Sequence, residues 1–206
     1  MTAINGDTGL PLGRAALELA LQSLAVRLNA AGATPVELVV CGGSALILGG
    51  LIARTTRDVD VVALIRDGAL RSPEPLPDDL RKAIREVAED LNLPENWLNN
   101  RPSRGEGGLF QMGLPAGFAE RLRCIRFGDR LAVHVIDRTD QIHFKLYAAA
   151  DRGGYHITDL MALGPTTEEL VTATRWAMTH DVSEGFVSVL KKLLRELGHE
   201  GAADQL

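Results

Sequence analysis

Aromatic side chains are scarce in this chain, at 4% of its 206 residues. A chain of this length can bury one sizeable core, so that core must be mainly aliphatic. Cysteine is also rare, and Cys41 and Cys124 form neither a disulfide framework nor a metal-binding spacing. We therefore expect two buried free thiols in a reducing compartment.

No apolar run is long enough to cross a bilayer, because the longest, residues 45–53, is short and interrupted by glycine. Residues 1–11 lack the basic start and the apolar stretch of a secretory signal peptide. We therefore expect a cytoplasmic protein that does not engage a membrane.

Positive charge is not in excess, since the formal net charge is -5 and the pI is near 5.6. An acidic balance argues against a dedicated binder of duplex DNA, whose affinity comes mainly from neutralised phosphates. Several arginines nevertheless lie close together in the sequence: Arg101, Arg104, Arg121, Arg123, Arg126 and Arg130. We interpret this cluster as a solvated face, although it is also the best place for a polyanion to dock.

The spacing of apolar residues predicts an α/β (α+β) part followed by a helical part. Strands are expected at residues 36–41, 58–65, 121–127 and 131–136, the last two as a hairpin, and a loop at residues 99–108. Helices are expected at residues 14–29, 44–52, 78–91, 139–150, 157–163, 166–179 and 183–197, with a capping box formed by Thr166 and Glu169. Residues 1–138 are interpreted as the α/β core, and residues 139–206 as helices packed on it.

Gly42, Gly43 and Ser44 form the first chemically informative segment, between an expected strand and an expected helix. A glycine turn that opens a helix presents backbone N–H groups to an anion, and the helix dipole adds to the attraction. Ser44 can add its hydroxyl. The segment has neither the lysine of a Walker loop nor the third glycine of a dinucleotide-binding motif. On its own, the glycine pair is equally well explained as a tight strand-to-helix turn.

Asp58 and Asp60 lie two residues apart on an expected strand, so their side chains project from the same face. Adjacent carboxylates repel one another unless a cation binds between them or one takes up a proton. Mg²⁺ prefers oxygen ligands and is commonly shared between one or two carboxylates and the phosphates of a substrate. The pair therefore predicts a site for Mg²⁺ or Mn²⁺ together with a nucleoside triphosphate, rather than two solvated edge-strand acids.

A third carboxylate would hold a second metal ion and deprotonate an attacking hydroxyl. Asp137, directly after the strand expected at residues 131–136, is the candidate. His134 lies nearer the centre of that strand, but a single histidine on a strand is more often structural.

Residues 36–163 resemble the nucleotidyltransferase superfamily, which has the polymerase-beta-like fold. Gly43-Ser44 followed by Asp58-Val59-Asp60 resembles its signature. Three further patterns are similar to its minimal prokaryotic branch of AbiEii and MenT-type toxin nucleotidyltransferases: Arg54-x-Thr56-x-Asp58-x-Asp60, the segment LPENWLN at residues 93–99, and Lys145-x-x-Ala148-x-x-x-Arg152 before Asp159. The departure from the family is the strand at residues 131–136, which has no acidic residue at its centre.

The resemblance implies a nucleotidyltransferase-fold mixed sheet flanked by helices, and roles for individual residues. Lys145 would contact the triphosphate, and Asp159 would support Lys145 or act as a base. The resulting catalytic set is Asp58, Asp60, Asp137 and Asp159, and the nucleotide-binding set is Gly42, Gly43, Ser44, Arg57, Lys145 and Arg152.

Ordinary structural roles remain open for three of these residues. Lys145 lies among apolar residues and could extend its ammonium group to solvent. Asp159 could simply complement a helix dipole, and Arg152 could be a surface residue beside Gly153 and Gly154.

The function expected from this resemblance is metal-dependent transfer of a nucleoside monophosphate from a nucleoside triphosphate to a hydroxyl. The leading acceptor is the tRNA 3′ end, in a toxin-like protein that has a cognate antitoxin as partner. One alternative, favoured by the acidic net charge, is a small-molecule or protein hydroxyl as acceptor. The other is a catalytically inactive binding module that keeps the fold, suggested by the missing central acid.

Overall fold

The computed structural model describes residues 11–206, which form a mixed six-stranded sheet with helices around it. The main strand order is β3-β2-β1-β6-β5, and a short strand β4 pairs with β2. Strand β1 runs parallel to β6, and β2 runs parallel to β4, whereas the other pairs are antiparallel. The strands are β1 (Val36–Cys41), β2 (Val59–Arg66), β3 (Ala69–Arg71), β4 (Leu98–Asn99), β5 (Arg123–Arg126) and β6 (Leu131–Val135). The expected α/β fold class is confirmed.

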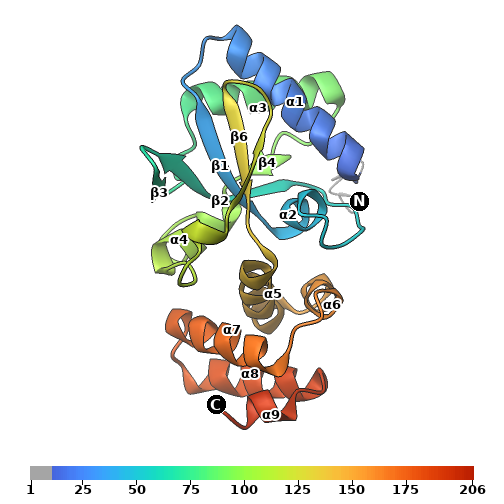
Figure 1. The fold of residues 1–206 in the computed structure, drawn as a ribbon, viewed down its shortest axis with the longest axis vertical. Helices are drawn as coiled ribbons and strands as arrows, with labels where there is room; N and C mark the ends of the chain where they lie inside the picture. The colour runs from blue at the N-terminus through green and yellow to red at the C-terminus, as the bar shows by residue number, and fades with distance from the viewer. Residues whose placement is uncertain (1–10) are drawn as a thin grey trace, which may run out of the picture.

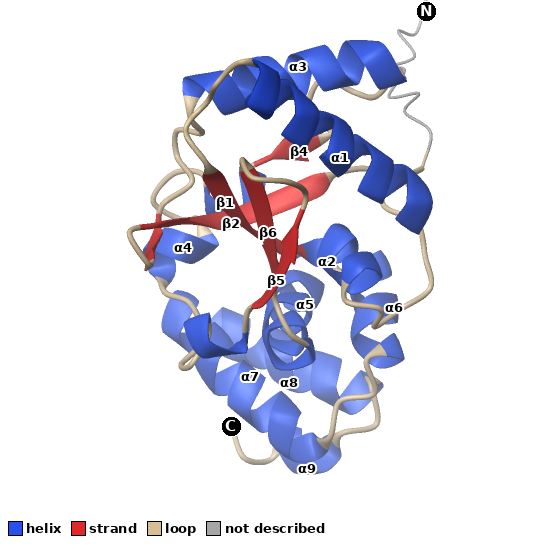
Figure 2. Ribbon diagram, turned by 45° about the horizontal axis from the view of Figure 1, so that its top comes forward, coloured by secondary structure: helices blue, strands red, loops and turns tan. Residues whose placement is uncertain are grey.

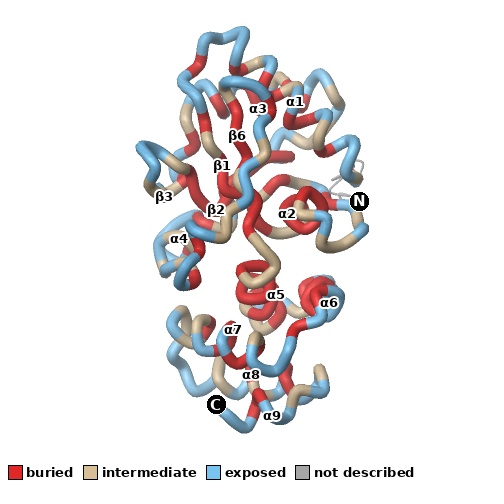
Figure 3. Tube along the Cα trace, viewed as in Figure 1, coloured by how far each residue is buried: buried red, intermediate tan, exposed pale blue. Residues whose placement is uncertain are grey.

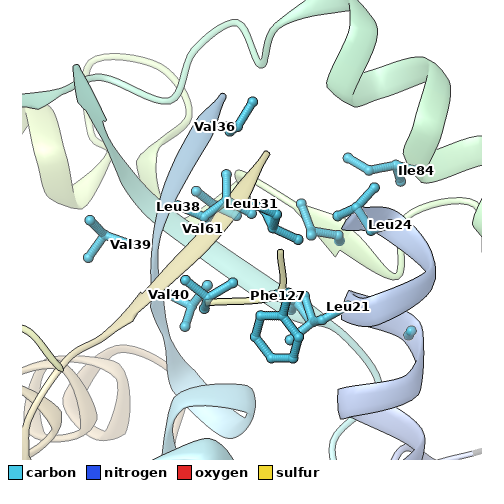
Figure 4. Packing of buried hydrophobic residues seen from close by; sticks show 14 of the residues in the cluster. Leu21, Leu24, Val36, Leu38, Val39, Val40, Val61, Ile84, Phe127 and Leu131 are labelled. Carbon is cyan, nitrogen blue, oxygen red and sulfur yellow. The ribbon is translucent and has the colours of Figure 1, made fainter. Parts of the chain in front are cut away.

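Helices α1 (Arg14–Ala30) and α3 (Asp78–Leu91) pack against the central strands and build an aliphatic core. Figure 4 shows Leu21 and Leu24 of α1, with Ile84 of α3, directed at the residues of β1 and β6. The central strands are buried along almost their whole length, which explains their near-continuous apolar sequence. This core fixes the sheet, and with it the ends of the strands.

The C-terminal helices form a second apolar cluster at the other end of the molecule, below the sheet in Figures 1 and 2. They are α5 (Arg138–Arg152), α6 (Tyr155–Ala162), α7 (Thr167–His180), α8 (Glu184–Glu196) and α9 (Glu200–Ala203). Helix α5 lies between the two clusters, and Figure 3 shows that most of it is buried. Trp176 of α7 packs against both clusters, so the sheet and the C-terminal helices are in direct apolar contact.

Most expected elements are confirmed, with shifted ends. Helix α2 (Gly42–Leu48) begins two residues earlier than expected and ends before Gly49. The capping box of α7 is present as expected, with Thr166 accepting from the Glu169 backbone N–H. Elements that the apolar spacing did not predict are all very short: β3, β4, η1 (Arg101–Ser103), α4 (Leu109–Met112), η2 (Ala119–Arg121) and α9.

The expectation that both cysteines are buried is wrong for Cys124. Cys41 is buried at the end of β1, but Cys124 is exposed on β5. Because β5 is an edge strand of the sheet, most of its residues remain in contact with solvent.

The arginine cluster is divided between structural contacts and solvent. Arg121 binds the buried Asp140, with 2.6 Å between Nη2 and Oδ1. Arg123 and Arg130 donate to the carbonyl oxygens of Leu48 and Ala33, each at 2.6 Å. Three of the six arginines are therefore engaged in contacts within the protein, which leaves the other three for a polyanion to bind.

Within residues 11–206, no helix is long and apolar enough to cross a membrane. The expectation about a signal peptide concerns residues 1–11, of which only residue 11 belongs to the described part of the chain.

Candidate active site

Asp60 lies where three strand ends meet. It pairs in register with Cys41 at the end of β1 and with Asn99 at the end of β4. The antiparallel β1–β2 pair places the start of β2 beside the end of β1, where α2 begins. The sheet topology therefore brings the carboxylate of Asp60 next to the glycine turn.

The glycine pair is required by this close approach. Gly42 has a φ of +66°, and a Cβ atom there would lie 3.0 Å from Oδ2 of Asp60. A Cβ atom at Gly43 would lie 2.5 Å from Oγ1 of Thr56, which no side chain can tolerate without movement. The loop before β2 is held in place at Thr56 by two backbone hydrogen bonds with Leu12, of 2.7 and 2.9 Å. Glycine thus lets the turn and the acidic strand touch.

Asp58 and Asp60 form an electrostatically strained pair. Val59 between them is fully buried, while both aspartates remain partly exposed. Burial, followed by the negative charge of Asp58, raises the pKa of Asp60 to about 6, while a hydrogen bond from Asn99 acts to lower it. Nη1 of Arg101 lies 4.0 Å from Oδ2 of Asp58. A divalent cation between the carboxylates would relieve their repulsion.

The residues present fit a cation shared with a substrate rather than a complete protein cage. Among residues 11–206, no three His, Cys, Asp or Glu side chains are grouped so that they could hold a metal ion. Two carboxylates alone suit Mg²⁺, which usually keeps waters and takes its remaining ligands from substrate phosphates. Asp58 and Asp60 are the residues that would hold it.

Asp137 does not join this pair. Its carboxylate caps α5 by accepting the backbone N–H of Asp140 at 3.0 Å, and it lies 3.7 Å from Nε of Arg121. An aspartate that directly precedes a helix readily takes this capping role. The structure therefore gives Asp137 a different function from the third carboxylate that was expected.

Ser44 also has a structural role here. Its side chain is fully buried, and Oγ donates to the carbonyl oxygen of Cys41 at 3.1 Å. The hydroxyl closes the turn from inside and is not presented to a phosphate. Gln141 of α5 donates to the carbonyl oxygen of Gly42 at 3.2 Å, which fastens the same turn to the C-terminal helices.

Lys145 and Asp159 form a buried ion pair, with Nζ 2.7 Å from Oδ2 and side chains only 4% and 7% exposed. Arg54, from the loop between α2 and β2, also binds both oxygens of Asp159. The alternative of a lysine extended to solvent is therefore wrong, and Asp159 has two cationic partners in addition to any interaction with the dipole of its helix. Through these contacts the cluster joins the α/β half to helices α5 and α6. The cluster lies beside the acid pair, since the charge of Lys145 also acts on the carboxyl of Asp60.

The other predicted site residues lie on the surface or elsewhere in the sheet. Arg57 is exposed directly before Asp58. Arg152 is exposed at the end of α5, with Nε 3.2 Å from Asp151. His134 is held by Glu37 at 2.7 Å, the structural role that a single histidine on a strand suggests.

Three residues of this region had no role assigned from the sequence. Arg54 belongs to the pattern that carries the family resemblance, and Asn99 belongs to the LPENWLN segment, so both could have been found there. Tyr155 has no such signal apart from its position after two glycines. Its ring lies near both cations of the cluster, with centroid distances of 5.6 Å to Arg54 and 5.5 Å to Lys145.

Comparison with protein families assigns most of the chain to one family. Residues 19–160 match the family described as nucleotidyltransferase of unknown function (DUF6036). The chain belongs to this family. The match contains the glycine turn, the acid pair and the Arg54, Lys145 and Asp159 cluster. No curated protein and no solved structure matches the chain.

The raised pKa of Asp60 makes the stability of the chain depend on pH. Between about pH 4 and pH 6 the folded chain keeps a proton that the unfolded chain releases, so stability falls as the pH rises through this window. Asp60→Asn removes this loss. With EDTA present, we expect the variant to gain about 2–3 kcal/mol over the wild type at pH 8, and clearly less at pH 5, in urea unfolding.

The matched control is Asp129→Asn, which changes an exposed aspartate in the β5–β6 turn. It should show the same small difference from the wild type at both pH values. Equal gains for Asp60→Asn at pH 5 and pH 8 would show that Asp60 is not strained by its surroundings.

The buried ion pair generates a second prediction. Asp159→Ala leaves the ammonium of Lys145 buried without its carboxylate, which should cost about 3–5 kcal/mol of unfolding free energy. Lys145→Met in the same chain should recover much of this loss, because the uncompensated buried charge is then gone. Chemical denaturation of the two variants measures the difference, and a double variant no more stable than Asp159→Ala would refute the pairing.

Proposed function

We propose that the chain transfers a nucleoside monophosphate from a nucleoside triphosphate to a hydroxyl acceptor, in a reaction that requires Mg²⁺ or Mn²⁺. The observation that carries this proposal is the position of Asp60 against Gly42, with the charges of Asp58 and Lys145 close enough to act on its carboxyl. Carboxylates, a close backbone turn and cations together form the surroundings that a metal-bound triphosphate needs.

Each group has a distinct task in this proposal. The bound metal ion would neutralise charge on the transferred phosphorus centre and on the leaving pyrophosphate. Asp58 and Asp60 would hold that ion, and the cluster of Lys145, Arg54 and Asp159 would supply positive charge beside the phosphates. Asp159 already binds two cations, Lys145 and Arg54, through its carboxylate oxygens. Its role in the proposal is therefore to position the two cations.

A polynucleotide acceptor, with the tRNA 3′ end as its leading form, is supported by a cavity beside Asn99. The cavity has a volume of about 350 Å³ and adjoins the strand end that carries Asp60. Three arginines and two glutamates line it: Arg81, Arg85, Arg104, Glu74 and Glu95. The arginines could bind acceptor phosphates next to the acid pair.

The resemblance to AbiEii and MenT-type nucleotidyltransferases supports a toxin-like role with a cognate antitoxin. Its Arg54 and Lys145 patterns coincide with residues that meet at Asp159 in the structure. A small-molecule or protein hydroxyl is the alternative acceptor, consistent with the net charge of -5.

A nucleotide-binding module without catalysis is the second candidate function. It is favoured by the position of Asp137, which caps α5 instead of completing a set of three carboxylates. Such a module would still bind a triphosphate through the same residues, but it would not transfer a nucleotide.

A transfer assay tests the proposal. The purified chain is incubated with Mg²⁺ or Mn²⁺, α-labelled nucleoside triphosphates, and either total tRNA or a mixture of cellular metabolites and proteins. We expect label in one acceptor fraction, and a fall of at least 100-fold in Asp58→Ala and in Asp60→Ala, because losing one ligand of the metal removes most transition-state charge stabilisation.

Asp129→Ala provides the matched control, since it removes an exposed carboxylate far along the chain from the acid pair. Absence of transfer by the wild type with every triphosphate, metal and acceptor fraction would overturn the catalytic proposal. Retention of triphosphate binding in that case would identify the non-catalytic module.

A further inference from the structure

Tyr155 is the one aromatic residue within residues 11–206 that is largely in solvent, with 60% of its surface exposed. It is the first residue of α6 and follows Gly153 and Gly154, which both have positive φ values near +60°. An exposed ring is unusual in a chain with so few aromatic residues. Its position is therefore informative.

The ring borders the candidate active site. It lies 5.6 Å from Cζ of Arg54 and 5.5 Å from Nζ of Lys145, measured to the ring centroid. Burial, followed by the charge of Asp60, raises the pKa of the Tyr155 hydroxyl, and Asp58 adds to this effect. Tyr155 therefore lies within electrostatic reach of both the cations and the acid pair.

The neighbouring histidine, His156, leaves a buried polar atom without a hydrogen-bond partner at this end of α6. Only 8% of the surface of His156 is exposed, and its Nδ1 atom has no hydrogen-bond partner among the described residues. Its ring centroid lies 4.1 Å from that of Tyr155. Buried polar atoms are normally paired, so an unpaired atom beside an exposed ring points to a surface that a ligand completes.

We propose that Tyr155 is the platform on which the base of the bound nucleoside triphosphate stacks. This inference rests on the proposed function, because it places the phosphates at the metal and the cations. An exposed ring next to those cations is then available to the other end of the same ligand. Aromatic rings stack on every base, since each base has a flat π-face. Both purine and pyrimidine nucleotides should therefore use Tyr155.

Calorimetric titration with and without a base on the ligand tests this role. ATP, UTP and inorganic tripolyphosphate are titrated into the full chain with Mg²⁺ present. For Tyr155→Ala we expect about tenfold weaker binding of ATP and a clear loss for UTP, with tripolyphosphate affinity within about twofold of wild type. Tyr155→Phe and Tyr155→Trp should restore nucleotide binding, because each keeps a flat ring.

Met161→Ala is the matched control, because Met161 is also an exposed side chain of α6, at 43%. It should bind all three ligands like the wild type. Unchanged ATP and UTP binding by Tyr155→Ala would overturn the stacking role alone. An equal loss for tripolyphosphate would also overturn it, and would show that the ring only positions Arg54 and Lys145. A wild-type chain that binds none of the triphosphates would contradict the proposed function as well.

Discussion

The close approach of strand β2 to the glycine turn before α2 is the constraint on which the site depends. A side chain at Gly42 would meet Asp60, and one at Gly43 would meet Thr56. Because Gly42 and Gly43 have no side chains, Asp60 lies directly beside backbone groups that an anion can approach. This arrangement also brings two carboxylates together in a partly buried position, and the resulting repulsion contributes to the raised pKa of Asp60. A protein retains such a pair where a ligand compensates it.

A second charge cluster, formed by Arg54, Lys145 and Asp159, connects the region of the acid pair to the C-terminal helices. Asp159 of α6 holds Lys145 of α5 and Arg54 of the loop that leads into β2. Removing any of these residues would affect both the packing of the two halves and the charge beside Asp60. Binding and stability are therefore coupled here, and variants of the cluster need a stability measurement alongside any activity measurement.

The sequence was sufficient to predict β1 and β2, the strands that flank the glycine turn and the acid pair, because their apolar runs and the glycine and aspartate patterns are local signals. It also placed Lys145 among apolar residues with the triphosphate as its expected partner, whereas the structure pairs its ammonium with Asp159 of the protein itself. It did not predict that Asp137 caps α5 or that Ser44 turns inward, since both depend on where the neighbouring backbone groups point. Short elements such as β4 were missed because two residues carry no periodicity, yet Asn99 of β4 contacts Asp60.

The central claim is that Asp58 and Asp60 together bind a divalent cation that a nucleoside triphosphate shares. Electron paramagnetic resonance of Mn²⁺, titrated into the chain with a non-hydrolysable triphosphate, tests it most directly. The account predicts Mn²⁺ binding by the wild type that is lost in both Asp58→Asn and Asp60→Asn, while Asp137→Asn keeps it. Mn²⁺ binding that survives in the first two variants, or is absent from the wild type, would contradict the account.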